Sequence, residues 1–486
     1  MSATTSRNRL LWLTWTVLSA LSAGLLWFGL QAGTEAPGPM NVVRTAFLPG
    51  QTSHGHHQIE LACSTCHGSE AFTAADVMQD ACTQCHGAEL KNVDDSHPRS
   101  KFTDPRNAER AARLDAAHCV TCHVEHKPDI THAMGVTLPT DFCVICHQDV
   151  ADDRPSHAGL GFDTCASSGC HNFHDNRALY GDFLVKHAGK PDLLDTREVL
   201  PRDWKTVLEE LYESYPIDRF PLQALTEPDA PAGKGSAQVH DEVNKDWLAT
   251  SHAKAGVNCS GCHEVAPAAG QPAMWADRPD HTVCATCHKP EVNTFLAGRH
   301  GMRLAAGMPA MTPAEAMIPM KADAPHDGIG CTTCHGAHRF DTAHAATDGC
   351  LACHADEHSK AFGASPHAAL AAKEASGALP AGSAVTCATC HMPRIEHRTD
   401  DVRRTLVQHN QNDTLRPSDK MLRPVCMRCH SLQFSIDALA DAGLVARNFR
   451  GKPSLHVESI DWALKDAARA EAERQAAKTG NPDGQP

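Results

Sequence analysis

Aromatic residues are scarce in this 486-residue chain, since phenylalanine, tryptophan and tyrosine together make up 5% of it and tyrosine occurs only three times. Hydrophobic residues account for 42%, so side chains alone would fill the core of a protein of this size poorly. After residue 30, no stretch is long and apolar enough to cross a membrane. These shortages exclude an ordinary cytosolic enzyme and a membrane-spanning bundle. They indicate that something other than side chains fills the interior.

Cysteine and histidine, in contrast, are abundant, with 22 and 33 copies. The pattern C-x-x-C-H occurs ten times, whereas chance at this composition would give about 0.07 matches. An eleventh copy has four residues between its cysteines, so eleven pairs use all 22 cysteines. The pairs are Cys63 with Cys66, Cys82 with Cys85, Cys119 with Cys122, Cys143 with Cys146, Cys165 with Cys170, Cys259 with Cys262, Cys284 with Cys287, Cys331 with Cys334, Cys350 with Cys353, Cys387 with Cys390 and Cys426 with Cys429. The histidines that directly follow them are His67, His86, His123, His147, His171, His263, His288, His335, His354, His391 and His430.

This pattern is the attachment signature of c-type haem. Each cysteine adds across a vinyl group of haem to form a thioether, and the next histidine then lies under the ring as the proximal iron ligand. The sequence therefore predicts eleven covalently attached haems c. Structural zinc or a disulfide framework would also use cysteine pairs, but neither explains a histidine after every pair. These alternatives stay open above all for the stretched copy at residues 165–171.

A second iron ligand is expected from the 22 histidines outside the motifs, which outnumber the eleven irons. We expect the second ligands among the histidines that stand just before or three residues after a motif, or in Gly- and Pro-marked turns. The candidates are His54, His57, His118, His126, His157, His252, His300, His326, His338 and His367, with His174, His281 and His344 also suitably placed. Methionine is the other common axial ligand, and Met302, Met308, Met311, Met317 and Met320 crowd one segment, which we interpret as a packed loop over a haem face.

The N-terminus contains the one long apolar run, at residues 10–30, with Arg7 and Arg9 before it. Twenty-one residues at ~1.5 Å each give ~31 Å, so we expect an uncleaved transmembrane helix, with a cleaved signal peptide as the alternative. The arginines place the N-terminus in the cytoplasm, and the rest of the chain in the periplasm, where haem c is attached. We therefore expect a protein anchored on the periplasmic side of the bacterial inner membrane, or a soluble periplasmic one after cleavage.

The charge is acidic, because 44 lysines and arginines stand against 58 aspartates and glutamates, a net charge of −14. This balance argues against nucleic acid and favours redox partners with basic docking faces, although it also serves simply to keep an exported protein soluble.

The motifs fall into two groups, five between residues 63 and 171 and six between residues 259 and 430. We expect a membrane anchor or signal peptide at 1–35, a pentahaem domain at 36–190, and a haem-free helix and linker at 191–240, with the helix at 203–215. A hexahaem domain at 241–460 and a charged helix with a disordered tail at 461–486 complete the prediction. Strand signals are scarce. The expected fold is mainly α and irregular loop, with two multihaem cytochrome c domains wrapped around stacked haems and one N-terminal transmembrane helix.

At these motifs the chain resembles the multihaem c-type cytochromes. Residues 50–190 resemble the class III, or doubled C-x-x-C-H, group through S-H-G-H-H at residues 53–57 and C-A-S-S-G-C-H at residues 165–171. In that group the H-x-x-H histidines are distal ligands, which implies this role for His54 and His57. Residues 245–460 are loosely similar to the nitrite reductase and hydroxylamine oxidoreductase superfamily through the segments 251–259 and 385–394. The chain lacks the C-x-x-C-K motif of the first family, and its tyrosines, Tyr180, Tyr212 and Tyr215, all precede the second group.

The function that we expect is electron transfer, of the kind used in anaerobic respiration, rather than catalysis. The chain would relay electrons between the membrane quinol pool, or a quinol-oxidising membrane subunit, and a periplasmic reductase or another cytochrome. The alternative is an oxidoreductase that acts on a small nitrogen or sulfur oxyanion at one open haem in the second half. Arg299, Arg303 or Arg394 would then hold the anion.

Overall fold

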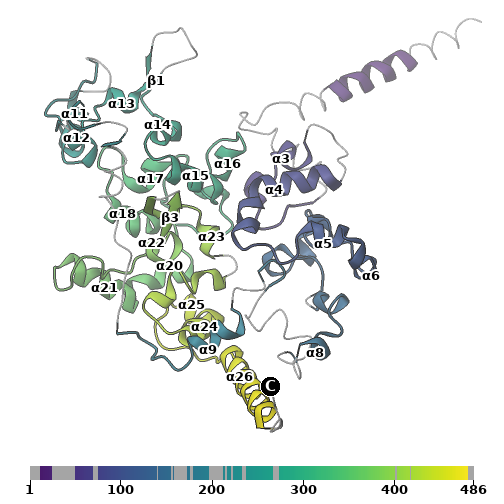
Figure 1. Ribbon diagram of the computed structural model, residues 1–486. Helices are drawn as coiled ribbons and strands as arrows, with labels where there is room; N and C mark the ends of the chain where they lie inside the picture. Colours follow the sequence, from purple (N-terminus) through teal and green to yellow (C-terminus); the bar gives the residue numbers. More distant parts are fainter. Residues whose placement is uncertain are drawn as a thin grey trace, which may run out of the picture. The chain divides into compact units, whose positions relative to one another are not determined.

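The computed structural model describes residues 11–24, 50–68, 75–139, 141–154, 157, 172–175, 179–195, 212–213, 216–219, 223–231, 237–265, 273–399, 402–415 and 418–479. Statements below about the structure concern these residues (Figure 1). The predicted helix at 203–215 and tail at 480–486 lie largely or wholly outside them, as do Cys165, Cys170 and His171.

Short helices joined by long loops make up most of the described chain (Figure 1). The α-helices are α3 (Cys63–His67), α4 (Ala75–Asn92), α5 (Arg99–Thr103), α6 (Ala108–Ala111), α7 (Cys119–Cys122), α8 (Val150–Asp153), α9 (Gly181–Lys186), α11 (Ala237–Leu248), α12 (Ser251–Lys254), α13 (Ser260–His263), α14 (His281–Ala285), α15 (Lys289–Ala297), α16 (Met302–Ala305), α17 (Cys331–His335), α18 (Thr342–Ala346), α19 (Asp348–Leu351), α20 (Glu357–Ala361), α21 (Pro366–Ala375), α22 (Cys387–His391), α23 (Gln411–Leu415), α24 (Leu432–Ala440), α25 (Ala442–Ala446) and α26 (Ser459–Thr479).

Single 3-10 turns connect many of these helices. They are η1 (His57–Ile59), η2 (Pro105–Asn107), η3 (Pro128–Ile130), η4 (Ala133–Gly135), η5 (Phe142–Ile145), η8 (Pro313–Glu315), η9 (Phe362–Ala364), η10 (Ser418–Met421) and η11 (Cys426–Arg428).

Capping residues start several of the helices where the chain leaves a loop. The side chains of Asp280, Asp356, Ser365, Ser431 and Asp441 each accept a hydrogen bond from a backbone N–H in the first turn of the helix that follows. Such caps satisfy N–H groups that have no partner inside the helix. They allow very short helices to form between loops.

Two small antiparallel sheets complete the secondary structure of the described residues. Strand β1 (Glu264–Val265) pairs with β2 (Met274–Trp275), and β3 (Arg394–Thr399) pairs with β4 (Val402–Val407). In the second sheet Arg394 lies opposite Val407 and Thr399 opposite Val402, so the strands form a hairpin. The sequence analysis did not predict this hairpin.

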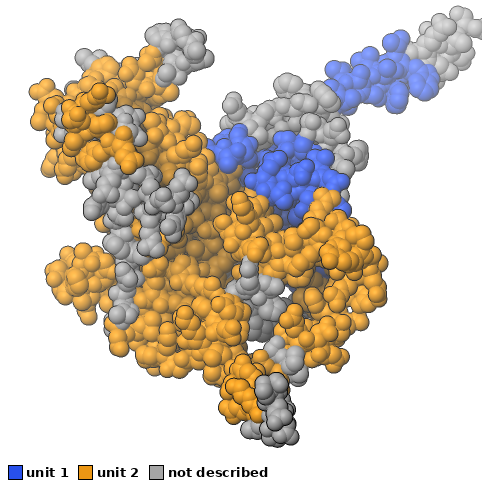
Figure 2. Space-filling view, viewed as in Figure 1, with its two compact units in different colours: residues 1–84, 118–138, 303–309 blue, residues 85–117, 139–302, 310–486 orange. Residues whose placement is uncertain are grey.

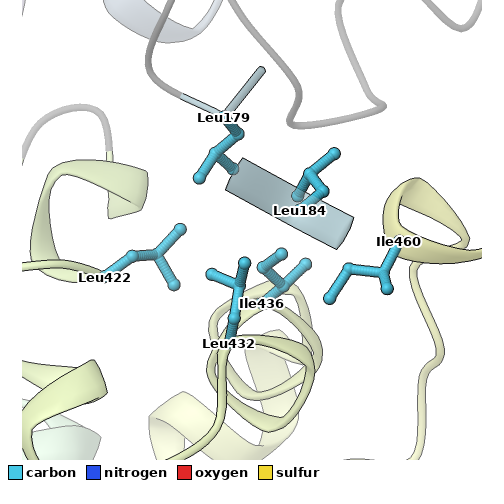
Figure 3. Packing of buried hydrophobic residues seen from close by; sticks show 6 residues of the cluster. All are labelled: Leu179, Leu184, Leu422, Leu432, Ile436 and Ile460. Atoms are coloured by element: carbon cyan, nitrogen blue, oxygen red, sulfur yellow. The ribbon is translucent and has the colours of Figure 1, made fainter. Parts of the chain in front are cut away.

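A buried hydrophobic cluster lies where α9, α24 and α26 meet (Figure 3). Its side chains point toward a common centre, and Leu432 is fully buried. The members are Leu179, Leu184, Leu422, Leu432, Ile436 and Ile460. Helix α26, whose N-terminal end contributes Ile460, covers the segment for which the sequence predicts a charged helix.

The chain divides into two compact units (Figure 2). Unit 1 consists of residues 1–84, 118–138 and 303–309, and unit 2 of residues 85–117, 139–302 and 310–486. Unit 1 contains α3 and α7, and unit 2 contains the hydrophobic cluster and both sheets. The domain boundaries given by the sequence stay predictions.

The predicted transmembrane helix at residues 10–30 is wrong. Among the described residues, no helix is long and apolar enough to cross a membrane. Residues 11–24 of the apolar run are described, and they are helical. The prediction rested on a count of apolar residues, which alone does not establish a membrane-spanning helix.

Candidate haem sites

Each described C-x-x-C-H motif has a helical or 3-10 turn, and the motif at residues 82–86 lies within the longer helix α4. In six of them the N–H of the motif histidine donates to the carbonyl oxygen of the first cysteine, at 2.8–3.0 Å, as in the pairs His263 to Cys259 and His430 to Cys426. This is the hydrogen bond of a single α-helical turn. It fixes the two sulfur atoms and the imidazole close together on a short piece of backbone, as thioether attachment beside an axial ligand requires.

The described cysteines are exposed or partly buried, and Cys63, Cys66, Cys85 and Cys287 are the exposed ones among them. Sγ of Cys146 lies 4.0 Å from the carbonyl oxygen of Arg110, and the carbonyl oxygen of Cys429 accepts from the N–H of Leu194 at 2.9 Å. These contacts do not test attachment, so haem attachment stays a prediction for every cysteine.

Eight of the motif histidines face a second histidine from elsewhere in the chain. The distances between the ring centres are all close to 6 Å. The pairs are His67 with His126 (6.4 Å), His147 with His97 (6.1 Å), His263 with His338 (5.9 Å), His288 with His252 (6.1 Å), His335 with His409 (6.3 Å), His354 with His300 (6.2 Å), His391 with His358 (6.0 Å) and His430 with His367 (6.4 Å).

This separation fits two imidazoles on opposite sides of one iron. An imidazole nitrogen binds a first-row metal at ~2.0 Å and lies ~1.2 Å from its ring centre, so the two centres should be ~6.3 Å apart. His54 and His57 also have ring centres 6.0 Å apart, but they stand on one turn, where local geometry alone gives this distance. In the eight pairs the partners stand far apart in the chain, so tertiary structure brings them together.

Hydrogen bonds at Nδ1 orient several of these rings. A carbonyl oxygen can only accept, so Nδ1 carries the hydrogen and Nε2 is left with the lone pair that binds a metal. Among the second histidines, Nδ1 of His126 donates to Gly50 O (2.9 Å) and that of His409 to Val407 O (3.0 Å). Among the motif histidines, His263 donates to Ala276 O (2.7 Å) and His430 to Asp192 O (3.0 Å).

Burial favours the neutral form of some of these imidazoles. Removal from water disfavours the charged ring, and burial lowers the pKa of His300 and of His391 to about 4. A neutral imidazole is the form that binds iron. Burial likewise raises the pKa of Cys390 and Cys426 to about 12, so these sulfur atoms lie in a water-poor environment.

Neighbouring motifs of the second group lie side by side in chain order. Two cross-motif thiol pairs lie close enough for each thiol to shift the pKa of the other, Cys284 with Cys331 and Cys350 with Cys387. Three further contacts are close enough for electrostatic interaction, and they link Cys262 to Cys284, Cys334 to Cys350, and Cys390 to Cys426. The six motifs from residue 259 to residue 430 therefore form an unbroken series. In the first group, Cys82 contacts Cys66 and Cys119 in the same way.

Five of the predicted second ligands lie opposite a motif histidine, namely His126, His252, His300, His338 and His367. The other predicted ligands have different surroundings. Nδ1 of His57 lies 3.2 Å from the carbonyl oxygen of His54, and Nε2 of His118 lies 3.7 Å from Asp76 Oδ1. His157 has a pKa lowered by burial, and His326 is exposed. The roles of these five stay predictions.

The sequence analysis missed three histidines that the structure places opposite motif histidines, namely His97, His358 and His409. One signal could have found His97. It follows the motif histidine His86 at nearly the same interval at which the predicted ligand His300 follows His288. His358 follows the motif histidine His354 by four residues, one more than the offset of His126 and His338, whereas no comparable signal marks His409.

The arginines considered as anion ligands and the crowded methionines make ordinary structural contacts. Arg299 donates from Nε to Asn412 Oδ1 (3.0 Å), and Arg303 donates to the carbonyl oxygens of Pro309 (3.0 Å) and Gln58 (3.1 Å). Met308 and Met311 are buried, which fits a packed loop.

For the zinc alternative, the described residues hold no group of three or more His, Cys, Asp or Glu suited to one metal ion, whereas structural zinc takes four ligands.

Residues 55–148 match the family model of cytochrome c3. The matched segment contains the first four motifs, and it supports a multihaem c-type cytochrome that carries covalently bound haem c and transfers electrons. No curated protein and no solved structure matches the chain. The resemblance of residues 245–460 to the nitrite reductase superfamily therefore stays a prediction.

Proposed function

We propose that the chain is an undecahaem c-type cytochrome of the periplasm that transfers electrons between redox proteins. The observation that carries the proposal is the pairing of histidines. Every motif histidine of the second group, from His263 to His430, lies opposite a second histidine. The count of eleven rests on the eleven motifs, which use all 22 cysteines.

Bound haem iron supplies one-electron redox chemistry. The residues of this chain decide what that chemistry can be used for. Two imidazoles from the protein would hold each such iron, and the iron would then have no position left at which a substrate could bind. The side-by-side order of the six motifs from residue 259 to residue 430 supports a path for electrons along this part of the chain.

The same pairing disfavours an oxyanion-reducing enzyme, because that function needs an open iron in the second half. Two of its candidate anion ligands are also engaged elsewhere. Arg299 is hydrogen bonded to Asn412, and Arg303 to two carbonyl oxygens.

The proposed location follows from the attachment chemistry, since haem c is joined to its cysteines outside the cytoplasm. The proposed partners are redox proteins with basic docking faces, which the net charge of −14 favours. The expectation of a quinol-oxidising membrane subunit rested on the predicted transmembrane helix. The proposal therefore names the donor and acceptor only as redox proteins.

Electron paramagnetic resonance of the purified, oxidised holoprotein, together with pyridine haemochrome quantitation, tests the proposal. We expect low-spin ferric signals only, and about eleven haems per chain. A high-spin ferric signal that integrates to a whole haem would favour the enzyme. About ten haems per chain would remove the stretched motif at residues 165–171 from the count.

A further inference from the structure

Two of the paired histidines share an unusual backbone. His126 and His338 each stand three residues after a motif histidine, in the sequences C-H-V-E-H and C-H-G-A-H. Both have positive φ angles, 61° and 65°, in a region that residues with a Cβ atom rarely adopt. A conformation of this kind persists only where the surroundings impose it. The last histidine of the C-H-x-x-H segment therefore has the same unusual backbone conformation in both places.

The histidines of these two segments also face corresponding motifs. His126, which follows the third motif of its group, faces His67 in the first motif of that group. His338 likewise follows the third motif of the second group and faces His263 in the first. The imidazole planes are nearly parallel in these two pairs, at 20° and 11°. In the other six pairs the planes differ by 40° to 86°.

A second correspondence concerns the fourth motif of each group. His97 stands a short way past the second motif of its group and faces His147 of the fourth motif. His300 stands at nearly the same interval past the second motif of its own group and faces His354, again of the fourth motif. In front of the first motif of each group stands the same tripeptide, Thr-Ser-His, at residues 52–54 and 250–252.

We infer that residues 52–147 and 250–354 share one ligation scheme for the haems of their first and fourth motifs. In each copy, the turn after the third motif ligates the first iron with nearly parallel imidazoles, and the histidine past the second motif ligates the fourth iron. This inference rests on the proposed function for its haem assignment. It goes beyond the family match, which ends at residue 148.

The repeat lies in the order of the ligands and not in the spacing of the motifs. The first two intervals between successive motifs are longer in the second copy than in the first, whereas the third interval is shorter. The motifs begin at Cys63, Cys82, Cys119 and Cys143 in the first copy, and at Cys259, Cys284, Cys331 and Cys350 in the second. Loops of different lengths are tolerated at small cost in chain entropy, so the ligand contacts can be kept while the connections change. A search of the sequence for a fixed period cannot find a repeat of this kind.

The angle between the imidazole planes gives the inference a spectroscopic signature. When the two planes are parallel, both imidazoles interact with the same one of two iron d orbitals and so separate the energies of these two orbitals. The electron paramagnetic resonance signal is then rhombic, with three resolved g values. Strongly rotated planes leave the two orbitals close in energy, which yields a signal with one large g value. The first irons of both copies should belong to the rhombic class and the fourth irons to the large-g class.

The test compares four single variants of the full-length holoprotein, each with methionine in place of one second histidine. His126→Met and His338→Met should each remove one haem equivalent from the rhombic class. His97→Met and His300→Met should each remove one from the large-g class. In every variant, the long-wavelength absorption band of sulfur-ligated ferric haem should appear and the haem count should stay unchanged.

His132 provides a matched control, since it follows the third motif histidine of the first copy without being a candidate ligand. His132→Ser should leave both classes intact. Loss from the wrong class, or no loss, would overturn the inference. If a variant fails to mature, the wild-type spectrum still tests the inference. Fewer than two haem equivalents in the rhombic class would contradict the shared ligation scheme. A high-spin wild-type signal would instead count against the proposed function.

Discussion

At the scale of single residues, the position of a hydrogen decides which nitrogen a histidine presents to iron. His409 shows this clearly, because the carbonyl oxygen of Val407 holds its Nδ1 hydrogen and Nε2 is left for the metal. Nothing in the sequence around His409 marks it as a ligand. Its partner His335 belongs to a motif far back in the chain, so only the fold brings the two together.

Replacing His409 with methionine should raise the reduction potential of one haem, because a thioether ligand favours ferrous iron over ferric iron. A spectroelectrochemical titration should show one component moved to higher potential with the haem count unchanged. Glu396→Met is a suitable control, since this exposed position adds a methionine without removing a histidine. If the whole titration curve of His409→Met matched that of the wild type, His409 would not be a ligand.

Glu125 provides a pH-dependent contact beside His126. Its carboxylate accepts hydrogen bonds from the Ser53 backbone N–H (2.7 Å), the Ser53 hydroxyl (2.8 Å) and His56 Nδ1 (2.6 Å). Burial acts to raise the pKa of Glu125, but these bonds outweigh it and lower the pKa from 4.5 to about 2. A lowered pKa means that the stabilisation is complete above about pH 4.5 and is lost as the pH falls toward 2.

Glu125→Gln should therefore reduce the free energy of unfolding at neutral pH by about 2 kcal/mol. It should also flatten the fall in stability below pH 4.5. Thermal melts of the holoprotein between neutral and acid pH measure both effects. Glu109→Gln removes an exposed carboxylate paired with Arg113, and it should change stability by less than about 0.5 kcal/mol. Equal effects of the two substitutions would contradict this role for Glu125.

At the scale of elements, short capped helices position the ligands. Helix α21 (Pro366–Ala375) carries His367 in its first turn, and the buried Ser365 caps that turn by accepting from the N–H of Ala368 at 3.1 Å. The cap and the proline at the first helical position are both visible in the sequence. The sequence does not show that the helix directs His367 toward His430, because this direction depends on packing.

Ser365→Ala should destabilise the protein by about 1 kcal/mol through loss of the cap. Because fraying of the first turn would loosen His367, the resonance signal of the His367–His430 iron should broaden, whereas the other signals should not. Ser365→Asp keeps a capping oxygen and should preserve both properties. Ser376→Ala, at the far end of the same helix, should leave the resonance signals unchanged. Broadening of all the signals in Ser365→Ala would point instead to a general loss of structure.

Comparison of sequence and structure shows what a pattern can and cannot determine. The motif turns follow from spacing, because two cysteines and a histidine on so short a segment leave little choice of backbone. Second ligands that stand next to a motif, such as His126 and His338, could be predicted for the same reason. His409 could not be predicted, since it stands next to no motif and only tertiary contacts bring it to its partner. The prediction for the apolar run at residues 10–30 was wrong because hydropathy alone does not establish a membrane-spanning helix.

At the scale of the whole molecule, the net charge of −14 governs encounter with partners. The rate of electron transfer to a basic redox protein should fall steeply as ionic strength rises, because salt screens the attraction that steers the two molecules together. The rate with an uncharged redox dye should hardly change. Stopped-flow measurements across a salt series compare the two. A basic partner that is insensitive to salt would show that charge does not guide docking.

The pairing of distant histidines has a further consequence for folding. Each occupied pair is a cross-link that closes a long loop of the chain, such as the loops from His67 to His126 and from His263 to His338. In the chain-entropy treatment of covalent cross-links, closure of loops this long removes about 4 kcal/mol of freedom from the unfolded state. The loops also overlap, because the one from His335 to His409 begins inside the second. Unfolding by denaturant should therefore leave a cross-linked network of ligated segments, and refolding should be slowed by histidines that have bound the wrong iron.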